Sequence, residues 1–92
     1  MAQIAVKVTI SGKVQGVFFR METQKAARAA GVNGYVRNLS NGSVEALFQG
    51  EEGLVDRMLE WCQTGSPGAR VDHIEQEDTL PREDCQGFDI TW

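Results

Sequence analysis

Near its N-terminus the chain alternates apolar side chains with small or polar ones at a period of two residues. The apolar positions are Ile4, Val6, Val8 and Ile10. Because alternate side chains of a β-strand point to opposite faces, residues 4–11 are predicted to form a strand with one buried face that ends at Gly12. The pattern is neither the continuous apolar stretch of a signal peptide nor that of a membrane-spanning helix, so we expect a cytoplasmic protein.

Two later stretches have the composition and spacing of amphipathic helices. Residues 21–30 are rich in Ala, Gln, Glu and Arg, which favour helix, and Gly31 is the expected C-terminal cap. The predicted buried face of this helix consists of Phe19, Thr23, Ala26, Ala27 and Ala30. A second helix begins near Glu51 and Glu52, whose charges suit a helix N-terminus, and stops at the turn 65–68. Its apolar positions are Leu54, Met58, Trp61 and Cys62.

Further strands are predicted from alternation and turn residues. Residues 35–39 and 43–49 flank Asn41-Gly42, a pair that favours a type I′ hairpin turn because both residues tolerate positive φ. Residues 71–77 are predicted to form a weaker strand with either a bulge or a late start, since Val71 and Ile74 have opposite parity. A short last strand contains Phe88, Ile90 and Trp92.

The element order is βαββαβ plus a short terminal strand. With right-handed crossovers, this order builds an α+β, ferredoxin-like two-layer sandwich, in which an antiparallel sheet carries two helices on one face. A length of 92 residues is expected to make one domain, residues 1–92.

The charge balance argues against several classes of partner. Nine Lys and Arg against 13 Asp and Glu give a net charge of −4, which repels a nucleic-acid backbone. Cys62 and Cys85 are too few and too far apart for a metal or redox motif, and no disulfide is needed. His73 has only scattered carboxylates near it, so no metal site is expected.

The turn between the first strand and the first helix combines bending residues with positive charge. Gly12 and Gly16 permit a tight curl, and Lys13 and Arg20 add charge to the positive end of the helix. Unpaired N–H groups at a helix start attract anions, although glycine-containing turns of this kind are common without a ligand. A nucleotide P-loop is excluded because Val14 stands where Ser or Thr is required, which leaves a single phosphate group as the expected anion.

Residues 12–20, GKVQGVFFR, closely resemble the signature loop of the acylphosphatases. Further matches to that family are Gly31, residues 34–39, residues 41–45 and residues 65–71, in the family's order and spacing. The departures are few: Ser66 stands where proline is common, and Met21 follows Arg20 where other residues are frequent. They put in doubt the rigidity of the loops and the shape of the acyl pocket, not the reaction type. The resemblance implies a ferredoxin-like enzyme that hydrolyses acyl phosphates to a carboxylate and inorganic phosphate, without a metal or cofactor.

The same resemblance assigns roles to individual residues. Arg20 would bind the phosphoryl group, and Asn38 would hold the attacking water, although Asn38 alone also fits an ordinary strand end before a turn. The phosphate-binding loop would act through main-chain N–H groups and comprises Gln15, Gly16, Val17, Phe18, Phe19 and Arg20. The side chains of residues 15–19 would matter less. Phe18, Phe19 and Met21 are candidates for an acyl pocket, with Phe19 equally suited to the core.

This chemistry is physically reasonable. A carboxylate with a pKa of about 4 leaves readily without a general acid, and a planar guanidinium can grip two phosphoryl oxygens at once. Asn38 cannot take a proton, so the proton of the attacking water goes either to phosphate or to solvent.

Two other functions compete with the enzyme. An RNA-recognition domain has the same fold but needs a basic face, and a phosphate-binding regulatory module would keep the loop without turnover, as in acylphosphatase-like domains of larger carbamoyl-transfer proteins. We expect a monomer that acts on a small acyl phosphate, with inorganic phosphate as product and competitive inhibitor. We expect neither nucleic acid nor membrane as a partner.

Overall fold

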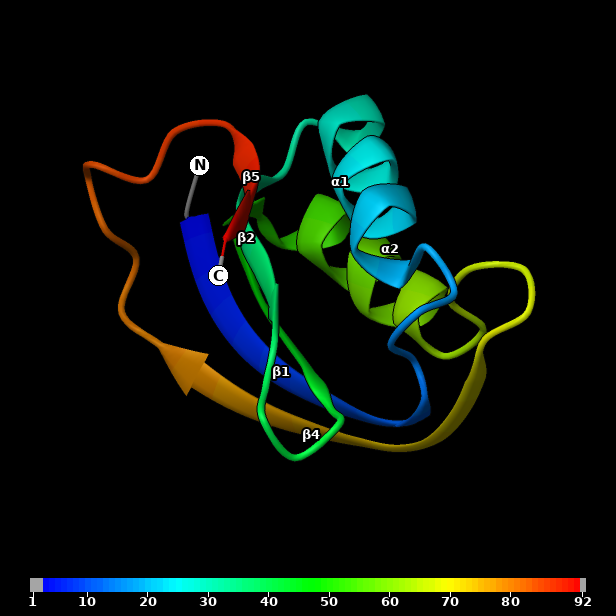
Figure 1. Cartoon of the computed structure of the whole chain (residues 1–92). Coiled ribbons are helices and arrows are strands. Elements are labelled where there is room, and N and C mark those ends of the chain that lie inside the picture. The colour runs from blue at the N-terminus through cyan, green and yellow to red at the C-terminus, as the bar shows by residue number, and fades with distance from the viewer. Residues whose placement is uncertain (1–2, 92) are drawn as a thin grey trace.

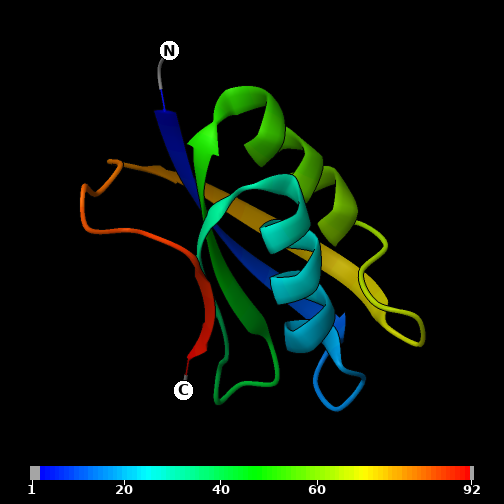
Figure 2. The same cartoon turned by 90° about the horizontal axis from the view of Figure 1, so that it is seen from above.

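The computed structural model describes residues 3–91, which form a layer of β-strands covered by two helices (Figure 1). In chain order the elements are β1 (Gln3–Lys13), α1 (Phe19–Ala30), β2 (Asn33–Asn38), β3 (Val44–Glu51), α2 (Glu52–Cys62), β4 (Arg70–Thr79) and β5 (Phe88–Thr91). Both helices lie on the same face of the sheet (Figure 2). The expected ferredoxin-like sandwich is confirmed.

The strand order in the sheet is β4-β1-β3-β2-β5. The first four of these are antiparallel to their neighbours, as expected, whereas β5 adds to β2 in parallel and makes the sheet mixed. This direction follows from the chain path, because residues 80–87 cross from the β4 edge to the β2 edge before β5 begins (Figure 1). The expected strand residue Trp92 lies outside the described residues.

The hydrophobic core lies between the sheet and the helices. Its strand residues share one parity, and its fully or almost fully buried members include Val6, Val8, Ile10, Val36, Val44, Ala46, Phe48 and Phe88. From the helices it receives Phe19 and Ala27 of α1 and Val55, Met58 and Cys62 of α2. Burial of each large apolar side chain is worth ~1.5–3 kcal/mol.

The predicted helix faces are largely confirmed. Ala26 and Ala30 of α1, and Leu54 and Trp61 of α2, are only partly buried at the margin of the core. Val55 is fully buried although the sequence pattern did not select it. None of the described helices is long and apolar enough to span a membrane.

The first strand is longer than predicted, because β1 continues through Gly12 to Lys13. Gly12 has φ 133° there, and a Cβ atom at this position would collide with the Arg70 carbonyl oxygen of β4. Ser11 pairs with His73 and Gly12 with Val71, so one residue of β4, Asp72, is extra. This is the bulge predicted from the opposite parity of Val71 and Ile74.

The prediction of a type I′ turn at Asn41-Gly42 is wrong. A type I′ turn requires positive φ at both central residues, and Asn41 is not among the positive-φ residues, whereas Gly42 has φ 92°. The Gly42 N–H donates to the Leu39 carbonyl at 3.2 Å. Asn41 keeps a negative φ while its side-chain Oδ1 accepts the Ser43 N–H at 3.0 Å, which stabilises a longer loop.

Candidate active site

The sheet register brings the ends of β1 and β2 close together. Ile10 and Asn38 both pair with Val44, one from each side of β3. Neighbouring strands are ~4.8 Å apart, so the backbones of Ile10 and Asn38 are separated by roughly 10 Å. Asn38 has the parity of buried Val36, so its side chain is directed to the helix-covered face, on which α1 begins.

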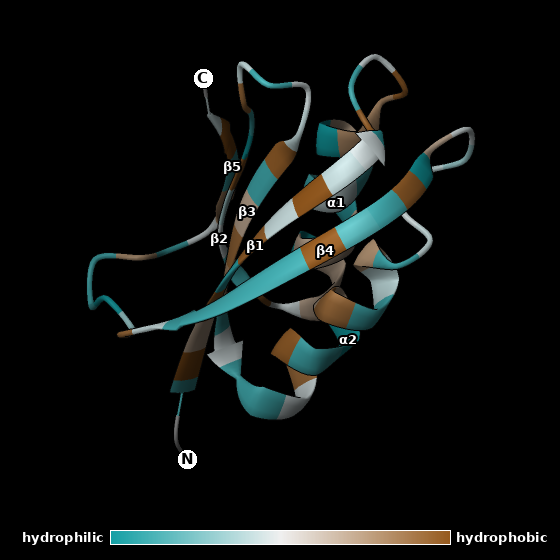
Figure 3. Ribbon diagram, turned by 90° about the horizontal axis from the view of Figure 1, so that it is seen from below, coloured by the Kyte–Doolittle hydropathy of each residue, from teal (hydrophilic) through white to brown (hydrophobic). Residues whose placement is uncertain are grey.

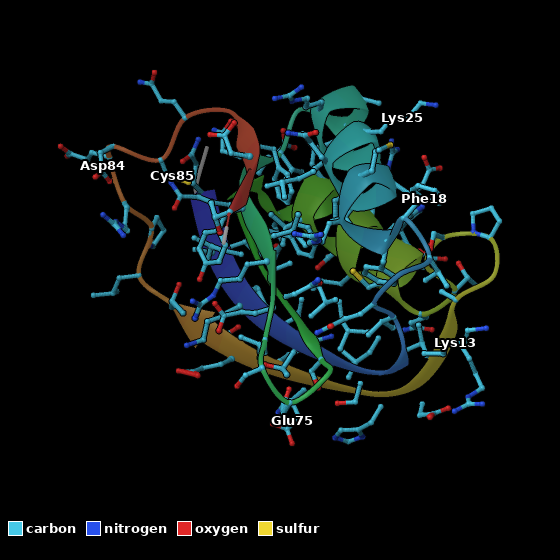
Figure 4. The ribbon with its side chains drawn as sticks, viewed as in Figure 1. Lys13, Phe18, Lys25, Glu75, Asp84 and Cys85 are labelled. Atoms are coloured by element: carbon cyan, nitrogen blue, oxygen red, sulfur yellow. The ribbon has the colours of Figure 1, made fainter. Side chains whose placement is uncertain are left out.

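The loop that connects β1 to α1 is anchored by Phe19. This side chain is 1% exposed and packs edge-on against Trp61, with ring centroids 5.6 Å apart. The preceding residue, Phe18, adopts φ 59° as the left-handed N-cap of α1 and is 72% exposed. Helix α1 therefore starts at Phe19, two residues earlier than predicted. Figure 4 shows Phe18 at this N-terminal end of α1.

A left-handed conformation is unfavourable for a bulky residue, and such backbone strain is concentrated at functional sites. Gly16 of the same loop has φ 75°, in agreement with the curl expected there. Both residues lie directly before α1, and the first N–H groups of a helix lack intrahelical acceptors. Arg20 is the second residue of α1. A helix N-terminus with an Arg side chain suits an anion.

Two side chains hold this loop in place. The hydroxyl of Ser66, which is 3% exposed, donates to the Val17 carbonyl at 3.0 Å. The side-chain amide of Gln15 donates to the carbonyls of Leu39 at 2.8 Å and Ser43 at 2.9 Å. The prediction gave the Gln15 side chain little weight, because a polar residue in a loop has no periodicity that could reveal its partner. Ser66, a departure from the family pattern, contributes a bond that restrains the loop.

A cavity of about 430 Å³ opens between the loop, α1, β2 and β5. Its lining residues are Val14, Gly16, Phe18, Phe19, Arg20, Met21, Asn38 and Ile90. Arg20 and Asn38, singled out from the sequence, thus border the same cavity. Met21 is 54% exposed at its rim, whereas Phe19 is mainly a core residue. Val14 and Ile90 were missed, although Ile90 follows the alternation of the last strand.

The side chain of Asn38 is unusual among the buried polar groups. Its Oδ1 atom is the one buried side-chain oxygen or nitrogen within residues 3–91 that lacks a hydrogen-bond partner. A buried polar atom without a partner costs free energy, so most are paired, and exceptions call for an explanation such as a ligand or a catalytic role. An amide that faces the cavity is able to bind a donor there.

Other titratable groups lie away from this cavity. On the outer face of the sheet, Glu45 accepts hydrogen bonds from Tyr35 at 2.8 Å and Arg37 at 2.9 Å. Burial raises the pKa of the Glu45 carboxyl, but these bonds, together with the positive charges of Arg37 and Lys7, outweigh that effect and hold the pKa below its usual value. Burial, followed by the bond to Glu45, raises the pKa of Tyr35 to about 12.

The cysteine and histidine side chains of residues 3–91 do not line the cavity. Cys62 and Cys85 are free, and burial raises the pKa of the Cys62 thiol to about 12, which makes this thiol a core group. The Nε2 atom of His73 lies 3.5 Å from a carboxylate oxygen of Glu75. Across residues 3–91 no group of three or more His, Cys, Asp or Glu side chains could hold a metal ion.

Comparison with known proteins points to one family. The family model for acylphosphatase matches residues 6–90. An acylphosphatase of Haloquadratum walsbyi is 53% identical over 83 residues, which cover 90% of this chain and 88% of the relative. An acylphosphatase of Haloarcula marismortui is 45% identical over 92 residues, all of both chains. The crystal structure of acylphosphatase from Bacillus subtilis superposes with a TM-score of 0.92 at 30% identity, covering 97% of this chain and 99% of that one.

Proposed function

This chain belongs to the acylphosphatase family and is an acyl phosphate hydrolase, and from that premise we propose that Arg20 and Asn38 carry out the reaction. The observation that supports these roles is their position on one cavity, although they come from different elements, α1 and β2. The cavity combines a guanidinium, the start of a helix and a side-chain amide. These are the groups needed to hold a phosphoryl group and a water molecule beside it.

In the proposed reaction the oxygen of water attacks phosphorus. The bond between phosphorus and the acyl oxygen breaks, and its electron pair leaves with the carboxylate. One proton of the water passes to a phosphoryl oxygen or to solvent. Because the transition state is loose, with charge spread over the phosphoryl oxygens, positioning and positive charge account for most of the catalysis. Arg20 provides both through a planar fork that binds two oxygens.

Asn38 is proposed to orient the attacking water. Its amide is neutral and takes no proton, but its oxygen accepts a hydrogen bond from water and so directs a lone pair of the water to phosphorus. The unpartnered Oδ1 supports this role, because a bound water would satisfy an otherwise costly atom. Holding the two reactants in line supplies a large part of a rate enhancement.

The lining of the cavity favours an apolar acyl group. Val14, Phe18, Met21 and Ile90 line the cavity together with Arg20 and Asn38. We therefore expect benzoyl phosphate to have a higher kcat/KM than acetyl phosphate, and Met21→Gln to reduce that preference severalfold. Leu80→Gln is the matched control, since Leu80 is 87% exposed and does not line the cavity. Equal effects of the two variants would contradict an acyl subsite at Met21.

The remaining expectations about partners also belong to the proposal. Inorganic phosphate, the product, should compete with substrate. A single domain of residues 1–92 is supported by one continuous core in residues 3–91. A monomer is supported at the β4 edge of the sheet, because β4 is largely hydrophilic (Figure 3) and carries Asp72, Glu75, Glu77 and Asp78. Acidic side chains oppose edge-to-edge pairing with a second copy. The two free cysteines suit a reducing compartment such as the cytoplasm.

Hydrolysis in ¹⁸O-labelled water with a chelator present tests the proposed reaction. Attack on phosphorus without a metal places the label in phosphate and leaves the rate unchanged by the chelator. Label in the carboxylate would instead mean attack on the acyl carbon, and loss of activity on chelation would contradict metal independence. Phosphate binding without turnover of any acyl phosphate would indicate a regulatory binding module.

A further inference from the structure

The side chain of Gln15 connects the loop that leads to Arg20 with the turn that follows Asn38. Gln15 lies in the loop between β1 and α1, and its Nε2 atom donates to the carbonyl oxygens of Leu39 at 2.8 Å and Ser43 at 2.9 Å. A primary amide has two N–H donors, so both are used. The two acceptors belong to the turn between β2 and β3, 24 and 28 residues away in the sequence.

Those two carbonyls lie where the two ends of the turn between β2 and β3 come together. The Leu39 N–H donates to the Ser43 carbonyl at 2.8 Å, and the Gly42 N–H donates to the Leu39 carbonyl at 3.2 Å. Each carbonyl thus receives one bond from within the turn and one from Gln15. Asn38 immediately precedes Leu39 in the chain. A shift of the turn relative to the loop would therefore move Asn38.

The opposite end of the loop is fixed independently. The Ser66 hydroxyl holds the Val17 carbonyl, and Phe19 is inserted into the core beside Trp61. Arg20 follows Phe19 directly in α1. The position of the loop is therefore set by Ser66, in the turn after α2, and by the packing of Phe19 against Trp61 in the core, and Gln15 transmits that position to the turn between β2 and β3.

We propose that Gln15 is a positioning residue, whose side-chain amide sets the place of Asn38 relative to the loop that leads to Arg20. This inference rests on the proposed roles of Asn38 and Arg20. It predicts that Gln15 affects the chemical step through Asn38 and leaves phosphoryl binding largely intact. A displacement of about 1 Å at a reacting group is enough to reduce a rate ~10²-fold.

The test uses Gln15→Met, which keeps the length of the side chain but removes both donors. The turn retains its own hydrogen bonds, so the variant should fold; Gln15→Glu, of the same shape, is the second variant. Gln24→Ala is the matched control, because the Gln24 amide also donates to a backbone carbonyl, that of Phe88 at 3.1 Å, away from the cavity. Circular dichroism establishes equal folded content before kinetics.

The expected result is a fall in kcat of about 10-fold to 10²-fold for Gln15→Met, with the inhibition constant of inorganic phosphate changed by less than about threefold. Gln24→Ala should leave kcat unchanged. In an Asn38→Ala background, Gln15→Met should lower kcat by less than about twofold, because the residue through which it acts is gone.

Two outcomes would overturn the inference. One is an equal loss of kcat from Gln15→Met in both backgrounds, and the other is weaker phosphate binding with kcat unchanged. These outcomes are distinct from failure of the proposed function, which would appear as full activity of the Asn38→Ala variant itself.

Discussion

Replacement of Asn38 by alanine should stabilise the folded protein while it lowers activity. In the substrate-free protein, where no phosphoryl group holds the attacking water beside Asn38, the buried Oδ1 atom has no hydrogen-bond partner among the described residues, and such an atom costs roughly 1–3 kcal/mol. Alanine removes this atom but also gives up the burial of about one carbon group, worth ~0.8 kcal/mol. The expected net gain is about 1 kcal/mol, which raises the Tm of a chain of this size by ~5 °C.

The assay is urea and thermal unfolding followed by circular dichroism, with Asn33→Ala as the matched control. Asn33 is on the same strand, but its Oδ1 accepts the Gly87 N–H at 3.0 Å, so its loss should cost about 1 kcal/mol. The two Asn→Ala substitutions should therefore change stability in opposite directions. If Asn38→Ala destabilises the protein as much as Asn33→Ala, the Asn38 amide is an ordinary structural group, and the reasoning from its unpartnered oxygen is refuted.

Three further predictions concern stability. Gly65→Ala should lower the free energy of unfolding by ~1–3 kcal/mol in chemical denaturation, because φ is 68° there and the new Cβ would lie 2.5 Å from the Phe19 ring. Gly68→Ala, at φ 87° with open space around the new Cβ, should lower it less. Equal losses of unfolding free energy would contradict the steric argument. The lowered pKa of Glu45 contributes stability above about pH 4.5 that is lost as the pH falls through the folded-state pKa. Glu45→Gln should therefore flatten the decline of unfolding free energy between pH 5 and pH 3, and an unchanged slope would exclude Glu45 as its source. The raised pKa of Tyr35 contributes stability that is present below pH 10 and lost as the pH rises toward 12. The free energy of unfolding of Tyr35→Phe should therefore decline less steeply with pH over that range. Identical declines in the variant and the unmodified protein would contradict this.

Periodicity predicted the layers of the fold because it reports which side chains are buried. Val6, Val8 and Ile10 point to the core as the alternation requires, and Gly31 caps α1 with φ 79°. Element ends were less predictable. Gly12 reads as a strand end, yet it stays in β1 because the close approach of β4 at the bulge requires a residue without a side chain.

The hairpin shows a second limit of local sequence. Asn41-Gly42 has the residues of a type I′ turn, but the Asn41 side chain bonds to the Ser43 N–H and the loop is longer. Both conformations are compatible with the same two residues, and the choice depends on surrounding contacts. One of these contacts is the pair of hydrogen bonds from Gln15, which is distant in the sequence.

In the candidate site, too, some features could be predicted from the sequence and others could not. Arg20 and Asn38 could be selected by resemblance, and the topology explains why they border one cavity. Supporting contacts such as Ser66 to Val17, and the left-handed backbone of Phe18, depend on tertiary structure and have no periodic signal. A polar Asn38 at a position with the parity of the core is the one local feature that would have marked it as exceptional.

The most direct test of the account separates binding of the phosphoryl group from attack by water. Benzoyl phosphate hydrolysis and inorganic phosphate binding are measured for the unmodified chain, Arg20→Lys and Asn38→Ala at equal folded content. We expect Arg20→Lys to lose both phosphate affinity and turnover, because a point charge replaces the fork, and Asn38→Ala to bind phosphate normally while kcat falls ~10²-fold or more. Full turnover by either variant, or loss of phosphate binding in Asn38→Ala, would contradict the proposed division of roles.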